Sequence, residues 1–183
     1  IDPDDSIKCS DGNDIVFSGV GGERNPYSVI CTSQPIPLHL SSFHFDIQVN
    51  NSGEDDRVSF GLSTSNVEKG VPGTSSNTIG FCGEDGQIWH NNEKVAVSSA
   101  EHLTEGETIC CNFTRIKTRN SSFTWCTFTR NREKIETPIL LDSNFLYYPT
   151  IAIASSGAHL KTNIGSGEPK CILGTASSVF TSG

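Results

Sequence analysis

The chain has 183 residues, a formal net charge of −8 and 34% hydrophobic residues. This length fits a single domain with its own hydrophobic core. An acidic chain lacks the basic surface that binds nucleic acid, and no apolar run approaches the ~20 residues of a membrane-spanning helix. We therefore expect neither a nucleic-acid nor a membrane partner. Because the chain begins at Ile1 and has no methionine, we expect it to be an excised or processed piece.

Apolar and polar residues alternate with a period of two along much of the chain, whereas the 3.6-residue period of an amphipathic helix is absent. Polar and glycine-rich turns separate the alternating segments. Short strands at this spacing are typical of an antiparallel β-sandwich. The segments are SFHFDIQV (42–49), VSFGLST (58–64), IGFC (79–82), ICCNF (109–113), FTWCTF (123–128) and the apolar positions of 151–164.

The stretch GEDG at 83–86 could be an acidic site or a tight backbone turn. Gly83 and Gly86 permit positive φ, and Asp85-Gly86 is a favoured hairpin pair. We interpret the stretch as a turn with Glu84 and Asp85 in solvent. The basic residues of 115–119 and 130–134 are likewise interpreted as solvated hairpin ends, with contact to an acidic segment of a partner as the open alternative.

Seven cysteines form no CxxC pair and no zinc-ligand spacing. Cys110 and Cys111 are adjacent on a predicted strand, so their side chains should point to opposite faces. We expect reduced, mostly buried thiols in a cytoplasmic or otherwise intracellular protein. Sequons at Asn50, Asn112 and Asn120 keep a secreted form open as the alternative.

Catalytic and metal-binding motifs are not recognisable. The histidines accompany no G-x-S-x-G elbow, and the carboxylates of 11–14 lack the twelve-residue loop of a calcium site. We therefore expect no enzyme activity, no cofactor and no metal.

Six segments in the same order resemble those of SPRY domains, over residues 24–165. Closest in character are SPRY domains of the Ran-binding-protein-M type, and RNPYSVICTSQPIP (24–37) also resembles SPRY-domain SOCS-box proteins. Arg132 stands where the family has a hairpin glycine, which weakens the prediction of a type I′ turn there. The six segments are SFHFDIQV (42–49), VSFGLST (58–64), IGFCGEDGQIW (79–89), TEGETICCNF (104–113), TFTRNREKI (127–135) and LYYPTIAIASSGAHLKTNIG (146–165).

The resemblance implies an all-β, concanavalin-like fold of two antiparallel sheets. Residues 24–165 would be the SPRY domain. Residues 1–23 would be an N-terminal extension that packs on the sandwich or leads into it. Residues 166–183 would be a closing strand or a flexible tail.

The resemblance also implies a non-catalytic module, monomeric in isolation, that binds a short peptide or a protein surface through its rim loops. The SOCS-box relatives carry a tryptophan where Ser155 stands, so this protein is expected to bind a different peptide. The ligand-binding residues carried over by matching position are Arg24, Asn25, Pro26, Tyr27, Arg57, Val71, Pro72, Gly73, Thr74, Ser75, Ala154, Ser155, Ser156 and Gly157.

The implied role is recruitment of a partner or substrate to a larger complex, such as a ubiquitin ligase or a scaffold. Two alternatives stay open from the sequence. One is a secreted, lectin-like or effector sandwich that binds carbohydrate. The other is a structural domain of a large multidomain protein.

Overall fold

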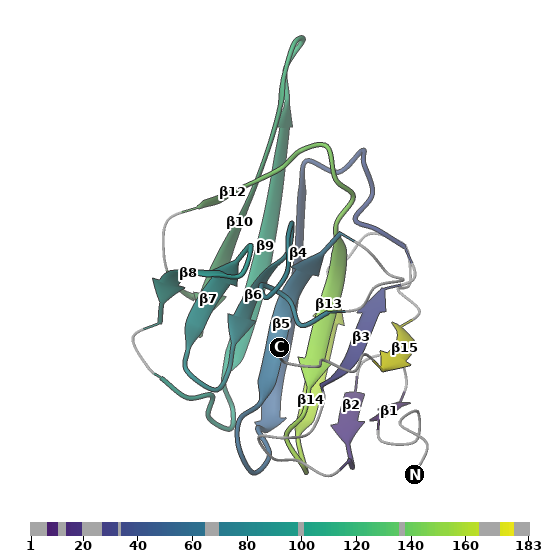
Figure 1. The fold of residues 1–183 in the computed structure, drawn as a ribbon, viewed down its shortest axis with the longest axis vertical. Coiled ribbons are helices and arrows are strands. Elements are labelled where there is room, and N and C mark those ends of the chain that lie inside the picture. The colour runs from purple at the N-terminus through teal and green to yellow at the C-terminus, as the bar shows by residue number, and fades with distance from the viewer. Residues whose placement is uncertain are drawn as a thin grey trace.

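The computed structural model describes residues 7–10, 14–19, 27–32, 34–64, 70–98, 101–135, 138–164 and 173–177. This part of the protein is built of β-strands and has no helix (Figure 1). None of these residues forms a helix that could cross a membrane. The strands are β1 (Ile7–Ser10), β2 (Asp14–Phe17), β3 (Ser28–Thr32), β4 (Ser42–Asn51), β5 (Val58–Ser63), β6 (Ile79–Cys82), β7 (Gln87–His90), β8 (Glu93–Val97), β9 (Thr108–Lys117), β10 (Ser122–Arg130), β11 (Glu133–Lys134), β12 (Ile139–Leu141), β13 (Tyr148–Ile153), β14 (His159–Ile164) and β15 (Leu173–Ser177).

The strands form two antiparallel sheets. Sheet A has the order β1-β2-β14-β4-β9-β10-β11, with β12 also paired to β10, and sheet B has the order β15-β3-β13-β5-β6-β7-β8. Strands from outside residues 24–165 join both sheets, β1 and β2 in sheet A and β15 in sheet B. The predicted antiparallel two-sheet sandwich is therefore confirmed.

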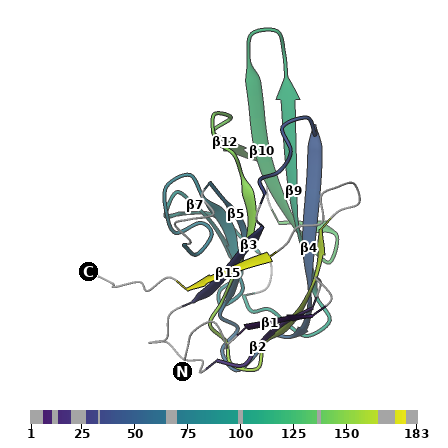
Figure 2. The same ribbon diagram turned by 90° about the vertical axis from the view of Figure 1, so that its right-hand side faces the viewer.

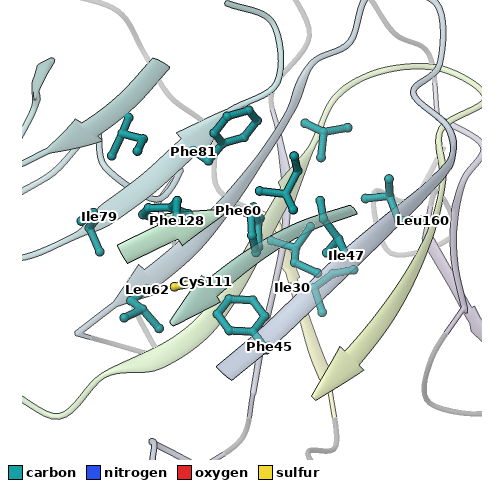
Figure 3. Close-up of a cluster of buried hydrophobic side chains, with 14 of the residues drawn as sticks. Ile30, Phe45, Ile47, Phe60, Leu62, Ile79, Phe81, Cys111, Phe128 and Leu160 are labelled. Atoms are coloured by element: carbon teal, nitrogen blue, oxygen red, sulfur yellow. The ribbon is translucent and has the colours of Figure 1, made fainter. Parts of the chain in front are cut away.

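Three phenylalanine rings connect the two sheets at the centre of the core (Figure 3). Phe60 of sheet B lies edge-on to Phe45 of sheet A, with ring centroids 5.2 Å apart, and to Phe128 of sheet A, at 5.8 Å. All three are apolar residues of segments in which apolar and polar residues alternate in the sequence, and all are at most 1% exposed. The alternation predicted from the sequence is thus what supplies the core.

The sequence predicts the turn at 83–86 correctly, and it predicts the turn between β10 and β11 less well. The GEDG stretch is a turn, since the Gly86 N–H donates to the Cys82 carbonyl oxygen at 2.9 Å and Gly86 has a φ of 65°. Between β10 and β11, Asn131 and Arg132 both have positive φ, 51° and 74°. This is the type I′ geometry that the arginine made less expected. Asn131 helps to hold it, because its side-chain oxygen accepts the Thr108 N–H at 3.0 Å.

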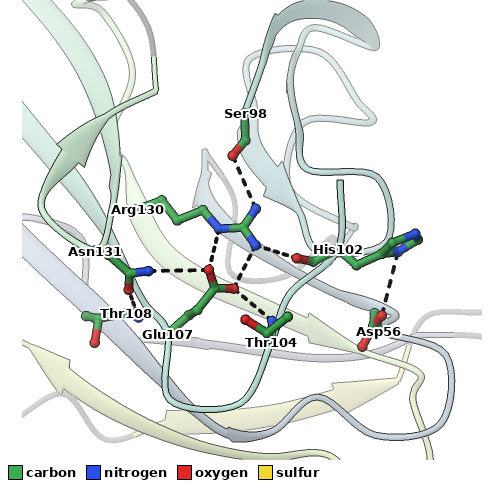
Figure 4. A network of polar contacts seen from close by, with 8 residues as sticks. All are labelled: Asp56, Ser98, His102, Thr104, Glu107, Thr108, Arg130 and Asn131. Atoms are coloured by element: carbon green, nitrogen blue, oxygen red, sulfur yellow. Dashed lines mark hydrogen bonds and ion pairs between the residues drawn. The ribbon is translucent and has the colours of Figure 1, made fainter. Parts of the chain in front are cut away.

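Arg130, at the end of β10, is a buried cation with a full set of partners (Figure 4). Its Nε and Nη2 donate to the two carboxylate oxygens of Glu107 at 2.8 and 2.7 Å. Nη1 donates to the Ser98 hydroxyl at 3.2 Å, and Nη2 also donates to the His102 carbonyl oxygen. Paired, charge-assisted hydrogen bonds of this kind are stronger than neutral ones. They fasten Ser98 and the segment 101–107 to sheet A.

The interpretation of 115–119 and 130–134 as solvated hairpin ends is wrong for two arginines. Arg115 is 3% exposed and Arg130 is 7% exposed. Both occupy inward positions of their strands, β9 and β10, which alternate between buried and more exposed residues. The end of the β9–β10 hairpin projects from the sandwich, at the top of Figure 1, and residues 116–123 are exposed.

Phe60→Ala should lower the free energy of unfolding by about 3–5 kcal/mol, because it opens a cavity where the two sheets meet. Chemical denaturation followed by tryptophan fluorescence would measure the change. Phe123→Ala is the matched control: Phe123 is 47% exposed, so its loss should cost less than about 1 kcal/mol. Equal losses would contradict this account of the core.

Glu107→Ala should lower the free energy of unfolding by about 3–5 kcal/mol, because the buried Arg130 charge would lose its counter-ion. Glu105→Ala, an exposed carboxylate of the same loop, should change stability by less than about 0.5 kcal/mol. A loss for Glu107→Ala no larger than for Glu105→Ala would show that the pair does not hold the segment.

The same ion pair gives a pH dependence of known sign. Burial alone would raise the pKa of Glu107, but hydrogen bonds from Arg130 and Thr104 outweigh burial and lower the pKa below its ordinary value of 4.5. The unfolded protein then takes up the proton first as the pH falls, so the pair stabilises the fold fully above pH 4.5 and progressively less below it. The stability difference between wild type and Glu107→Gln should shrink as the pH falls below 4.5, in denaturation curves recorded across that range.

Candidate functional site

Three strand ends meet at one rim of sheet B. β3 begins directly after Tyr27, β5 begins directly after Arg57, and β13 ends directly before Ala154. Because β13 pairs in antiparallel register with both β3 and β5, these three residues lie side by side. The Ala154 N–H donates to the Arg57 carbonyl oxygen at 2.8 Å. The tertiary register therefore brings together three separate segments that the sequence predicted to bind a ligand.

The Tyr27 ring and the Arg57 guanidinium form the centre of this rim. The Arg57 Cζ atom lies 4.7 Å from the centroid of the Tyr27 ring, in a cation–π contact. Tyr27 is half-buried and packs against Val29, Val71 and Ala152 on the outer face of sheet B. Arg57 is only 9% exposed. Both side chains are thus held by contacts within the protein.

The Tyr27 hydroxyl keeps its proton at neutral pH. Burial raises the pKa of Tyr27, the neighbouring Cys82 and Glu84 raise it further, and the Arg57 hydrogen bond and charge lower it in part. A neutral phenol can both donate and accept a hydrogen bond. The rim therefore offers a partner an amphipathic ring with a polar end.

The segment 70–78 folds back over the outer face of sheet B. Val71, Pro72 and Gly73 are buried there. Gly80 of β6 makes room for them, because a side chain on Gly80 would collide with the Pro72 carbonyl oxygen. A larger residue at Gly80 would lift the segment away from Tyr27.

Two hydroxyl groups hold the exposed turn of this segment. The Thr74 hydroxyl donates to the Val71 carbonyl oxygen at 2.9 Å, and Thr78 makes the other bonds. The Thr78 hydroxyl accepts the Gly73 N–H at 2.9 Å and the Ser75 N–H at 3.3 Å, and it donates to the Ser75 carbonyl oxygen at 2.7 Å. Thr74 and Ser75 consequently present their side chains to solvent on a fixed turn. They are the members of the predicted 71–75 loop that a partner could contact directly.

The turn after β13 interlocks with the turn before β5. Ser155 is fully buried, and its hydroxyl accepts the Asp55 N–H at 3.1 Å. The Ser156 carbonyl oxygen accepts the Glu54 N–H, also at 3.1 Å. Gly157, with a φ of 78°, is exposed. In this turn Ser155 positions the backbone, while Ser156 and Gly157 form the outer surface.

Carboxylates lie on the turns next to the aromatic and cationic centre. Glu54, Asp55 and Asp56 lie in the turn before Arg57. The β6–β7 corner lies next to the start of β5, since the Gly83 N–H donates to the Val58 carbonyl oxygen at 2.7 Å. That corner adds Glu84 and Asp85. The sequence interpretation treated these two as turn residues alone, because only the pairing of β5 with β6 brings them to the rim.

Three thiols, those of Cys82 near the rim and of Cys110 and Cys111 in sheet A, are not activated. Burial, with the nearby Asp85 charge, raises the pKa of Cys82 to about 11. Burial also raises the pKa of Cys110 to about 11 and that of Cys111 well above its ordinary value. Thiols that stay protonated at neutral pH are weak nucleophiles. Among the described residues, no group of three histidine, cysteine or carboxylate side chains could hold a metal ion.

The structure describes part of the predicted ligand surface. Arg24, Asn25 and Pro26 lie outside the described residues. Tyr27 and Arg57 come together at the rim, beside the segment 70–78 and the turn after β13. Their role in binding stays a prediction.

Comparison with known proteins places this fold. No family model matches the sequence. The curated relatives are Ran-binding protein 9 of Xenopus tropicalis and of Xenopus laevis, each 24% identical over 151 residues that cover 81% of this protein. The chain spans about a quarter, 26%, of the length of these relatives.

Two solved human structures are similar over nearly their whole length. A human SPRY domain superposes with a TM-score of 0.63 and 18% identity, covering 86% of this protein and 94% of the solved one. The SPRY domain of human HERC1 superposes with a TM-score of 0.60 and 18% identity, covering 91% and 99%. The protein therefore has the SPRY-domain fold that its sequence resembles.

Proposed function

We propose that the protein is a non-catalytic protein-interaction module that holds a segment of a partner protein at the Tyr27–Arg57 rim. The observation that carries the proposal is the stacked tyrosine and arginine at the junction of three loops. Tyrosine and arginine, with tryptophan, dominate the energetic centres of protein interfaces. Both curated relatives are named as Ran-binding proteins, and a protein partner here is in keeping with that name.

Rigidity of the rim supports binding of this kind. The turn before β5, the turn after β13 and the segment 70–78 are fastened by backbone or buried side-chain hydrogen bonds, at Ala154, Ser155 and Thr78. A surface already fixed loses little conformational entropy when it binds, so a few side chains are enough for useful affinity. The resemblance further leads us to propose that the module recruits its partner to a larger complex, such as a ubiquitin ligase or a scaffold.

The charges of the rim define the chemistry of the partner segment. Five carboxylates, at 54–56 and 84–85, belong to the segments next to Arg57 and Tyr27. A segment with an apolar or aromatic residue for the Tyr27 face and a lysine or arginine beside it would complement this pattern. Binding should therefore weaken as salt is added, since exposed charges are screened.

Peptides selected from a displayed random library on the immobilised domain would test the proposal. The selected peptides should be enriched in lysine or arginine and should bind Tyr27→Ala at least about tenfold more weakly than wild type in fluorescence polarisation. Tyr148→Ala removes a half-buried tyrosine at the opposite end of β13, and its affinity should stay within about twofold. Melting temperatures of the variants would establish that both still fold.

Two results would overturn the proposal. One is a set of selected peptides that bind Tyr27→Ala and wild type equally. The other is loss of binding in Tyr148→Ala with Tyr27→Ala unaffected, which would move the binding surface to the opposite end of the sandwich.

A further inference from the structure

A second candidate site lies at the opposite end of the sandwich, at the base of the projecting β9–β10 hairpin. The loop that leads from β3 into β4 runs beside that base (Figure 2). Two contacts fasten it there: the Arg115 N–H donates to the Ser41 carbonyl oxygen at 2.8 Å, and Lys117 Nζ donates to the Leu38 carbonyl oxygen at 3.1 Å. Between loop and hairpin is a pocket of about 220 Å³, lined by Leu38, His39, Leu40, Ser41, Arg115 and Lys117.

Arg115 is a buried cation without a counter-ion in the described part of the protein. Its Nη1 and Nη2 atoms have no hydrogen-bond partner among the described residues, and each is exposed by less than 1 Å². The guanidinium carbon lies 4.9 Å from the centroid of the Phe113 ring, which supplies one cation–π contact and no acceptor. The residues that line the pocket include no carboxylate. Burial lowers the pKa of Arg115, yet arginine stays charged at neutral pH.

The unfavourable free energy of an unpaired buried charge is the reason to look for a ligand at Arg115. A buried charge is normally paired and hydrogen-bonded, because its removal from water is otherwise unfavourable. Arg130, the other inward-facing arginine of these two strands, follows that rule with Glu107. Arg115 departs from it beside a pocket that also includes Lys117 and His39.

We propose that this pocket binds a carboxylate group of a partner protein, with the Arg115 guanidinium as its counter-charge. The planar guanidinium matches the two oxygens of a carboxylate, and one negative charge neutralises it. The apolar walls at Leu38 and Leu40 favour a small monoanion next to an apolar side chain over a doubly charged phosphate. Leu38 and His39, both exposed, would turn aside to admit it.

The carboxylate could belong to an aspartate or glutamate side chain or to the C-terminal end of a polypeptide, and small probes distinguish the two. N-acetyl-aspartate amide carries a side-chain carboxylate, N-acetyl-leucine a terminal one, and N-acetyl-leucinamide neither. In low-salt NMR titrations, at least one of the two carboxylates should shift the Arg115 Nε–Hε resonance at millimolar concentration, and the amide should not. The compound that binds more tightly shows whether the site prefers a side-chain or a C-terminal carboxylate.

Substitutions at Arg115 separate binding from folding. Arg115→Met keeps a stem of similar length, should melt no lower than wild type because it removes an unpaired buried charge, and should bind the preferred carboxylate at least about tenfold more weakly. Arg115→Lys should bind with intermediate affinity, since lysine keeps the positive charge but lacks the paired N–H donors of the guanidinium. Arg119→Met, which removes an exposed positive charge at the tip of the same hairpin, should bind like wild type.

Three outcomes would overturn the proposal. Shifts equal for the carboxylates and the neutral amide would show that no anion is bound. Equal binding by Arg115→Met and wild type would remove Arg115 from the site. Inorganic phosphate that binds tighter than either carboxylate would assign the pocket to phosphate groups instead. None of these results bears on the Tyr27 rim, which lies at the other end of β9 and β13.

Discussion

The contact between the two sheets at Phe60 is the interaction on which the rest of the structure depends. Phe60 of β5 meets Phe45 and Phe128 of the other sheet in edge-to-face contacts. Aromatic pairs in this geometry add to the hydrophobic gain from burying the rings. The same strand continues back to Arg57 at the rim. The centre of the candidate site is therefore fixed by a core residue three positions away in the sequence.

Glycines on the outer face of sheet B leave room for the segment that lies beside the rim. Gly61 and Gly80 are paired on neighbouring strands, and side chains at either position would collide with nearby backbone atoms. Because Gly80 has no side chain, the segment 70–78 lies directly on the sheet, and Val71 reaches the Tyr27 ring. The absence of a side chain at Gly80 is therefore as important for the structure of the rim as the residues that form it.

Two inward-facing arginines, both buried, differ in whether their charge is paired. Arg130 is paired with Glu107 and fastens a loop, so its charge serves the fold. Arg115 lies at the other end of the same strand pair, and none of the described residues accepts a hydrogen bond from its terminal nitrogens. An unpaired buried charge is unfavourable for stability, and natural sequences accept such costs mainly where a site has a function. That contrast is the reason for proposing a ligand at Arg115 and a structural role for Arg130.

The sequence by itself determined the strands at 42–49, 58–64, 79–82, 109–113 and 123–128, their inward residues and the GEDG turn, because alternation and turn chemistry are local properties of a polypeptide. It did not predict β1, β2 or β8. It could not show that Arg115 and Arg130 are buried, since a basic residue beside a hairpin is usually solvated. Nor could it predict the type I′ turn at Asn131–Arg132, which depends on contacts of Asn131 with Thr108 and Glu107.

The grouping of Tyr27, Arg57 and Ala154 into one rim was available beforehand only through the resemblance to SPRY domains. The residues come from three segments, and their distances follow from the register of β13 with β3 and β5. Register is set by pairing between strands far apart in sequence, which local patterns do not specify. Local chemistry therefore decided what each segment becomes, and tertiary pairing decided which segments meet.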